Sequence, residues 1–486
     1  MSTVLKNGDP GIDEQIRLLD LPIGTGMTGL RVESDALGHV QVPANRYWGA
    51  QTQRSLTHFA IGEDHMPKAV FHAYGYVKKA AAAVNWANGS LPRWKAEIIE
   101  LVADEVISGK LDSEFPLYAW QSGSGTDVNM NVNEVISNRA IQLVGGTLGS
   151  KHPIHPHDDV NKGQSSNDTF PTAMHIAAVL EIQNYLLPRL QRLGDAINAK
   201  SDEWRDVVKI GRTHLQDAVP LTVGQEWSGY AAQLEDAAAR VQGNLRDLYQ
   251  LAIGGTAVGT GLNAPAGFAT QVAATIGDFL GLPFSSAPNK FAAQAALDAV
   301  VHAMAGLRSL AVSLMKIAND IRWLASGPRC GLGELRLPAN EPGSSIMPGK
   351  VNPTQCEVLV MVCIQVLADD VAVAFAGSQG NFELNAMRPI VICKFLNSAR
   401  ILADACDMFR EHCILGIELN RDRIDEYVQR SLMLATALSP VIGYDRTAAI
   451  VQKAVDENLT LREAAVSSGD LSPKEFDEIM EPARMV

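Results

Sequence analysis

The chain has 486 residues, of which 47% are hydrophobic and 20% are charged, and these fractions are ordinary for a soluble globular protein with a large core. The usual relation between length and domain count predicts about three domains. The formal net charge of −13 argues against nucleic acid or an anionic membrane as a partner, so an anionic substrate requires a local cationic pocket.

The N-terminal part of the chain predicts a domain of modest helices behind a polar tail. The first 45 residues are polar and without sustained period, which predicts a partly disordered tail and then a short hairpin over residues 30–42. We assign residues 1–164 to this domain. Its helical periodicity covers residues 70–85, 95–108 and 127–143.

Long helices are predicted for the middle of the chain. Four segments are rich in Ala, Leu and Val and strongly periodic: residues 172–197, 223–251, 297–324 and 354–376. Their three-and-four spacing suits near-parallel packing, and apolar residues on more than one face favour oligomerisation. Strand signals are sparse, so the predicted fold class is mainly α.

We therefore expect an elongated central bundle of long helices, flanked by two smaller, mostly helical domains. The bundle covers residues 165–420, and the C-terminal domain covers residues 421–486. Within the C-terminal domain, Ser472, Pro473 and Glu475 form a good helix start, with a Ser N-cap and a Glu at the third helical position.

A loop over residues 327–353 interrupts the bundle between two of its predicted helices. Ten of its 27 residues are Gly or Pro, which excludes a helix or a central strand. Its polar cluster of serines, Lys350 and Asn352 favours a functional loop over a linker. A phosphate-binding P-loop is excluded because five residues separate Gly343 from Gly349 and Val351 replaces the required Ser or Thr.

Three further polar stretches interrupt the helical pattern. Residues 121–126 precede a predicted helix, and they suit either anion binding at a helix start or a flexible loop. Residues 152–169 contain three histidines within six residues, for which we favour a solvated surface loop over a metal site. Residues 209–217 place His214 among Arg, Thr, Gln and Asp, where a structural and a catalytic role are equally open.

The cysteines and the N-terminus predict a reduced, cytoplasmic protein. No CxxC occurs, and two cysteine pairs are spaced seven apart, as expected of buried thiols on one helical face rather than of zinc or iron–sulfur ligands. The acidic N-terminus suits no targeting peptide, and no run approaches 18 apolar residues. We expect no metal, no cofactor and no membrane partner.

Residues 343–353, with the sequence Gly-Ser-Ser-Ile-Met-Pro-Gly-Lys-Val-Asn-Pro, resemble the signature loop of the fumarase/aspartase superfamily. From about residue 31 onward the chain is similar to the class II, iron-independent fumarases. Gly-Arg-Thr-His at 211–214 and Thr-Gln-Cys-Glu at 354–357 favour a fumarase, because aspartases place Gln where His214 stands. Further stretches that match in the same order are residues 48–54, 122–126, 165–168 and 315–330.

The resemblance implies a fumarate hydratase of the tricarboxylic acid cycle. It implies reversible anti-elimination of water from L-malate to fumarate through an aci-carboxylate intermediate, in a homotetramer whose active sites are shared between subunits. Ser344 is then the base, and His214, paired with Glu357, is the acid–base partner acting through a water. The resemblance assigns substrate binding to Ser124, Gly125, Thr126, Ser165, Ser166, Asn167, Thr213, Ser345, Lys350, Val351 and Asn352.

One motif departs from the family pattern. Fumarases typically have His-Pro-Asn-Asp where this chain has His155, Pro156, His157 and Asp158, and usually a basic residue where His152 stands. That segment forms the family's secondary dicarboxylate site, near but outside the active site. The departure puts transfer of the secondary site in doubt or makes its affinity depend on pH.

Two other functions remain open at this point. The first is an ammonia-lyase acting on aspartate. The second is a lyase fold retained as a structural protein, against which the full set of candidate catalytic residues argues. An iron–sulfur fumarase is excluded by the mainly helical pattern and the scattered cysteines.

Overall fold

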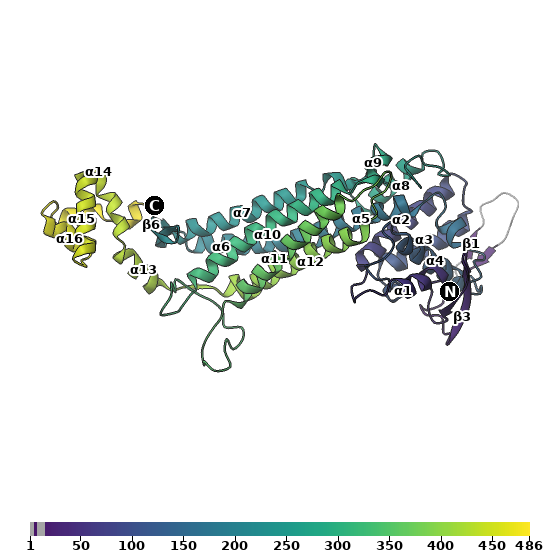
Figure 1. Cartoon of the computed structure of the whole chain (residues 1–486), viewed down its shortest axis with the longest axis horizontal. Helices are drawn as coiled ribbons and strands as arrows, with labels where there is room; N and C mark the ends of the chain where they lie inside the picture. The colour runs from purple at the N-terminus through teal and green to yellow at the C-terminus, as the bar shows by residue number, and fades with distance from the viewer. Residues whose placement is uncertain (1–3, 7–14) are drawn as a thin grey trace. The chain divides into compact units, whose positions relative to one another are not determined.

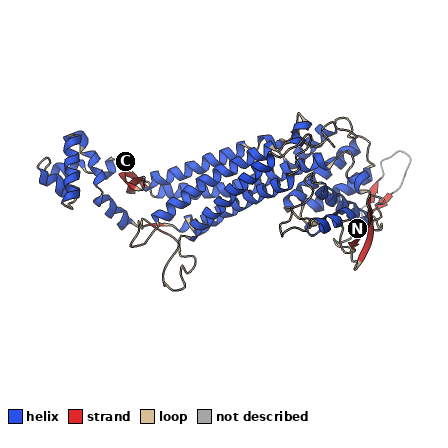
Figure 2. Ribbon diagram, in the orientation of Figure 1, coloured by secondary structure: helices blue, strands red, loops and turns tan. Residues whose placement is uncertain are grey.

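The computed structural model describes residues 4–6 and 15–486, and helix dominates them (Figures 1 and 2). Within these residues there are 17 α-helices, whereas the strands form only two-stranded pairs. The predicted mainly α class is confirmed. The predicted disorder of the N-terminal tail falls partly on residues 1–3 and 7–14, which lie outside the described residues.

The N-terminal hairpin is confirmed. Strand β3 (Leu30–Asp35) pairs antiparallel with β4 (Gly38–Pro43), and Asp35 pairs with Gly38 at the turn. A second antiparallel pair joins β1 (Val4–Lys6) and β2 (Gln15–Arg17).

The first of two compact units contains Met1–Leu186, Arg240–Arg308 and Gln365–Ile401. Helix α2 (Lys68–Ala87) is its central element, since Phe71, Tyr74 and Val77 are fully buried along it. The other helices that lie wholly in this unit are α1 (Ala50–His58), α3 (Arg93–Ile107), α4 (Thr126–Leu143), α5 (Ser166–Glu181), α8 (Phe268–Leu280) and α9 (Lys290–Ala295). A short parallel pair joins β7 (Gln250–Leu251) and β8 (Ser285–Ser286).

The second unit contains Leu187–Ala239, Ser309–Ile364 and Leu402–Val486. Its β5 (Val208–Thr213) and β6 (Gln216–Thr222) form an antiparallel hairpin, and β9 (Leu335–Arg336) pairs with β10 (Glu418–Leu419). Ile210 of β5 lies in one apolar cluster with the C-terminal helices, so this cluster anchors the hairpin. Those helices are α13 (Arg421–Arg430), α14 (Ser439–Ile442), α15 (Tyr444–Asp456), α16 (Leu461–Ser468) and α17 (Pro473–Ile479).

The long helices follow the predicted segments closely. The segment predicted as one helix over residues 172–197 is divided by a π-helical turn (Ile182–Leu186) into α5 and α6 (Leu187–Glu203). The others are α7 (Val223–Gly243), α10 (Asp298–Leu324), α11 (Thr354–Gly377) and α12 (Arg388–His412). Helix α7 ends before the predicted residue 251, and α12 was not predicted.

Polar contacts hold the long helices of the second unit beside one another. The hydroxyl of Tyr230 on α7 donates to Asp320 on α10 at 3.1 Å, and Arg189 and Arg192 of α6 pair with Asp407 of α12 at 3.0 and 2.7 Å. Each contact joins two helices that are far apart in sequence. The three-segment domain division by residue number stays a prediction.

Two helices, α10 and α11, are long and apolar enough to cross a membrane by length and composition alone. Core helices of soluble proteins pass the same test. Helix α11 leaves a row of apolar side chains exposed, comprising Val358, Met361, Ile364, Val371 and Phe375.

Candidate active site

The polar loop over residues 122–126 is held in place by close backbone packing in the first unit. A Cβ on Gly123 would lie 1.6 Å from the carbonyl oxygen of Ala386. Gly125 has a φ of 78°, in the left-handed region, and a Cβ there would lie 2.2 Å from the ring of Phe170. The sequence therefore needs glycine at both positions to bring the intervening Ser124 against the start of α4.

A chain of hydroxyl groups links this loop to the start of α5. Ser122 and Ser124 lie 3.1 Å apart at their Oγ atoms, and Ser124 lies 2.7 Å from Thr126 Oγ1. Thr126 Oγ1 in turn lies 2.9 Å from Ser166 Oγ. The N-termini of α4 and α5 thus meet around uncharged donors, an arrangement that favours a carboxylate.

The start of α5 is fixed by a capping box. The Oγ of Ser165 accepts from the amide of Asn167 at 3.2 Å, while the amide of Ser165 donates to Asp168 Oδ1 at 2.9 Å. The other oxygen of Asp168 accepts from the amides of Gly254 and Thr256, both at 2.9 Å. Burial raises the pKa of Asp168 to about 6, against the lowering effect of these three amide donors.

A buried lysine that is not predicted from the sequence lies behind these residues. Lys78 of α2 donates to the side-chain oxygens of Asn129, Gln164 and Asn161 at 2.7, 2.9 and 3.1 Å. Burial lowers the pKa of Lys78 to about 7, because its direct partners are neutral amides and only the more distant Asp168 favours its charge.

Arg388, the first residue of α12, is the second functional candidate that the sequence did not reveal. It is fully buried and donates to the carbonyl oxygens of Gln294 at 2.7 Å and Ser124 at 3.4 Å. Burial lowers the pKa of Arg388 to about 10. A buried guanidinium therefore braces the backbone of the polar loop.

We predict that Gly123→Ala displaces this loop. Because the added Cβ meets the backbone of Ala386 rather than a flexible side chain, the loop must move, at a cost of roughly 1–3 kcal/mol in the free energy of unfolding. The KM for substrate should rise as well, which steady-state kinetics with thermal unfolding will measure.

Gly194→Ala is the matched control for that substitution. Gly194 lies inside α6 with nothing within 4 Å of a Cβ, so alanine should stabilise the protein by about 0.5–1 kcal/mol. If Gly123→Ala and Gly194→Ala have the same free energy of unfolding and the same KM, close packing does not require glycine at position 123.

In the second unit, His214 lies at the tip of the β5–β6 hairpin. His214 and Leu215 form its turn with φ values of 56° and 62°, and Thr213 pairs with Gln216 beside them. Both His214 and Thr213 are exposed. The segment predicted as non-periodic is therefore a β-hairpin whose turn presents the imidazole of His214 to solvent.

A buried ion network supports the hairpin from behind. Lys209 Nζ lies 2.7 Å from Glu226 and 2.8 Å from Glu334, and Arg212 pairs with the other oxygen of Glu334 at 2.5 Å. Lys209 and Glu334 are both 2% exposed. Since Glu334 belongs to the 327–353 loop, this network joins that loop to the base of the hairpin.

The signature loop is closed by its own backbone. The amide of Gly343 donates to the carbonyl of Lys350 at 3.0 Å, and Asn352 Nδ2 donates to the carbonyl of Gly343 at 2.7 Å. Ser344 Oγ accepts from the amides of Ile346 and Met347 at 3.2 and 3.1 Å. Two N–H groups therefore point at the hydroxyl oxygen of Ser344.

The remaining signature residues lie at the surface. Ser345, Lys350 and Val351 are exposed, and Glu357 is exposed in the first turn of α11. Among the residues that the structure describes, no hydrogen bond within one chain joins His214 to Glu357 or to Ser344.

The candidate residues thus fall into two groups. Residues 124–126 and 165–167 belong to the first unit, and residues 213–214, 344–345, 350–352 and 357 belong to the second. Within the first group a hydrogen bond joins Thr126 to Ser166, and in the second unit the ion pairs of Glu334 join the 327–353 loop to the base of the hairpin.

The segment that departs from the family pattern forms a capped turn. The Nδ1 of His155 accepts from the amides of His157 and Asp158 at 3.2 and 3.1 Å, while Pro156 opens the turn and is buried. His157 Nε2 lies 3.2 Å from Gln51 Nε2, and burial lowers the pKa of His157. Binding of a dicarboxylate here stays a prediction.

No group of three or more His, Cys, Asp or Glu side chains suited to a metal occurs in the described part of the chain. The six cysteines are free thiols, and burial raises the pKa of Cys363 and Cys393 to about 12. The arrangement offers hydroxyl, amide, imidazole and ammonium groups, which can bind carboxylates and move protons.

Comparisons with known proteins all match one group of related enzymes. A family model described as Lyase matches residues 38–368, and one described as Fumarase C C-terminus matches residues 434–486. The chain is 70% identical over 469 residues to a protein named fumarate hydratase class II from Methanosarcina acetivorans, covering 96% of this chain and 97% of that protein.

Two further likenesses agree with this. A mitochondrial fumarate hydratase from Rhizopus oryzae is 58% identical over 458 residues, covering 94% of this chain and 92% of that protein. The crystal structure of a recombinant class II fumarase from Schistosoma mansoni has a TM-score of 0.92 at 44% identity, covering 94% of this chain and 99% of that chain.

Proposed function

The chain belongs to the class II fumarate hydratase family, and from that membership we propose a mechanism in which Ser344 and His214 move the protons. The enzyme is a fumarate hydratase, a lyase that interconverts L-malate and fumarate. The proposed route is reversible anti-elimination of water within the tricarboxylic acid cycle. The C3 proton leaves first, which gives an aci-carboxylate intermediate, and the C2 hydroxyl then leaves as water.

Ser344 takes the C3 proton as an alkoxide. A free serine is far too basic to ionise near neutral pH, so its oxygen needs donors that stabilise negative charge. The observation that carries this proposal is the pair of amide N–H groups, from Ile346 and Met347, that donate to Ser344 Oγ. Such fixed donors, with the ammonium of Lys350 in the same loop, favour the alkoxide and lower the pKa of the hydroxyl.

The developing charge of the intermediate falls on the substrate carboxylates. The meeting N-termini of α4 and α5 supply the uncharged part of their binding site through Ser124, Thr126 and Ser166. Gly125 lets this loop approach closely, and Ser165 and Asn167 complete the start of α5. From the second unit we assign Thr213, Ser345, Lys350, Val351 and Asn352.

His214 protonates the departing hydroxyl through one water, and Glu357 pairs with it in the assembled enzyme. The hairpin turn leaves the imidazole exposed, and the buried Lys209–Glu334 ion pair joins the base of the hairpin to the 327–353 loop. Both features suit a group that acts on substrate bound by another part of the enzyme.

We predict that His214→Asn lowers kcat by about 10²–10⁴-fold, because asparagine cannot transfer the proton. An inflection of the wild-type pH–rate profile should be lost in this variant, because it lacks the imidazole that transfers the proton in the proposed mechanism. A profile with the wild-type inflection would remove His214 from this role.

We further propose a homotetramer with shared active sites. The exposed apolar row on α11, including Met361 and Phe375, gives each chain a surface that a second copy can cover. Sharing follows if the hairpin and signature loop of one subunit face the polar loops of another. Nothing in the composition favours nucleic acid as a partner, and we infer a cytoplasmic location.

A further inference from the structure

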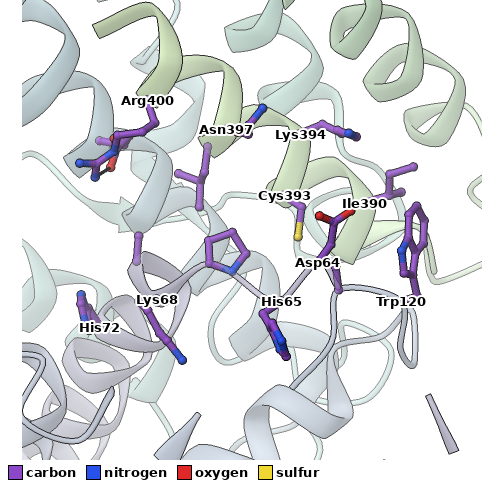
Figure 3. A pocket seen from close by; sticks show the side chains of 15 residues that line it. Asp64, His65, Lys68, His72, Trp120, Ile390, Cys393, Lys394, Asn397 and Arg400 are labelled. Atoms are coloured by element: carbon purple, nitrogen blue, oxygen red, sulfur yellow. Dashed lines mark hydrogen bonds and ion pairs between the residues drawn. The ribbon is translucent and has the colours of Figure 1, made fainter. Parts of the chain in front are cut away.

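A cavity of about 480 Å³ lies in the first unit, apart from the residues assigned to substrate (Figure 3). Its volume is in the range of small-molecule sites. One wall is α12, which presents Cys393, Lys394 and Asn397, and Figure 3 shows Lys68 and His72 of α2 on the opposite side.

The charges of the cavity favour an anion. Glu181 and Arg400 neutralise each other through an ion pair at 2.7 Å. Lys68 donates to the backbone carbonyl oxygen of Phe115, and Lys394 forms an ion pair with Asp369 at 3.5 Å.

Asp64 is the remaining carboxylate that lines the cavity, beside the ammonium groups of Lys68 and Lys394; Asp369, the buried partner of Lys394, does not line it, so Lys68 is the main attraction for an anion. Helix α2 also begins at Lys68, and its N-cap, Pro67, offers no side-chain cap, so the positive end of the helix adds to the attraction. Burial lowers the pKa of Lys68, and a bound anion would offset that effect.

The remaining lining favours an aromatic or apolar body on that anion. The indole of Trp120 is 41% exposed at the rim of the cavity, and Ile390, Leu396 and the methylene stem of Lys394 provide apolar surface. Burial raises the pKa of the Cys393 thiol to about 12, so it acts as a small apolar group.

Three elements that line the cavity also position the substrate residues. Trp120 is followed within six residues by the polar loop, and α5 runs from Ser166 to Glu181 in the cavity wall. Helix α12 runs from Arg388, which holds the carbonyl of Ser124, to Arg400, which pairs with Glu181. Helices α12 and α5 therefore connect the cavity to the polar loop over residues 122–126.

We propose that this cavity binds a small organic anion, an aromatic or apolar body with one carboxylate or phosphate group, and that its occupancy changes the affinity of the polar loop for malate. The coupling rests on the proposed assignment of Ser124, Thr126 and Ser166 to substrate. The binding itself rests only on the cavity.

Titration calorimetry of the full-length enzyme tests the binding, with 2-naphthoate, 2-naphthyl phosphate and neutral 2-naphthol as probes in an equilibrated malate–fumarate mixture. We expect the double variant Lys68→Gln, Lys394→Gln to bind the anionic probes at least about tenfold more weakly than wild type. The anion that binds more tightly shows whether the cavity prefers a carboxylate or a phosphate group. Neutral 2-naphthol should bind at least about tenfold more weakly than either anion.

Lys79→Gln is the matched control, because Lys79 also lies on α2 but pairs with Asp104 at 2.8 Å. It should bind the probes as wild type does. Equal affinity of the double variant and wild type for the anionic probes overturns the proposal. Probe binding that occurs in buffer alone but is abolished in the malate–fumarate mixture also overturns it.

Steady-state kinetics test the coupling. A saturating anionic probe should change the KM for malate by about threefold or more in wild type and leave it unchanged in the double variant. An unchanged KM in wild type contradicts the coupling. Failure of the proposed substrate assignment is distinguishable, because the calorimetric signal at Lys68 and Lys394 does not depend on turnover.

Discussion

Replacing Ser344 with alanine is expected to lower kcat by a factor on the order of 10² or more, with a much smaller change in KM. The substitution removes the proposed base and leaves the groups that hold the carboxylates. The Ser344 hydroxyl accepts two amide hydrogen bonds in a loop whose amides water can reach, so stability should change little. Exchange of the C3 proton of malate in deuterium oxide should be lost together with turnover.

Ser228→Ala is the matched control for this substitution. Ser228 is an exposed serine of α7, and its hydroxyl donates only to the carbonyl of Gln225 one turn earlier, at 2.7 Å. It should keep wild-type kcat. Near-wild-type turnover or C3 exchange in Ser344→Ala would exclude Ser344 as the base, and the two amides would then have only a structural role.

Mixing two inactive variants is expected to restore activity, because the candidate residues are divided between the two units of the chain. Thr126→Val removes a hydroxyl from the first group, and His214→Asn removes the imidazole from the second. If every active site takes these groups from different subunits, about a quarter of the sites in a random one-to-one mixture contain both native segments.

The experiment co-expresses the two variants with different affinity tags and measures the doubly purified enzyme. Activity near a quarter of wild type per site supports shared sites, whereas each variant alone should stay close to its own residual rate. Activity that never exceeds the average of the two pure variants would place each site within one chain. The same measurement on mixtures of two second-group variants, His214→Asn and Ser344→Ala, then shows whether one active site takes these two residues from different subunits.

The long helices could be predicted because their apolar period is uninterrupted. Helix α11 begins at Thr354, directly after Pro353, and ends within one residue of the predicted boundary. Helix α7 stops early at Gly243, where a short 3₁₀ turn over Arg246–Tyr249 replaces it. Helix α12 carries Lys394, Asn397 and Arg400 among its apolar residues, which obscures its period.

The groups that support the candidate site could not be predicted from the sequence, because they are buried charged side chains. The β5 strand has Lys209 on its inner side, so the alternation of apolar and polar residues that identifies a strand is absent. Lys78 and Arg388 are fully buried and bonded to amide and carbonyl oxygens, and nothing local in the sequence distinguishes them from surface cations. The sequence shows the glycines of the polar loop, but it does not show that Ala386 and Phe170 pack against them.

Fumarate formation from malate and from aspartate, followed by ultraviolet absorbance in separate assays, tests the proposed reaction most directly. We predict turnover of L-malate that is lost in Ser344→Ala, and no measurable turnover of aspartate. Fumarate formed from aspartate but not from malate would contradict this prediction, because the site would then be that of an ammonia-lyase.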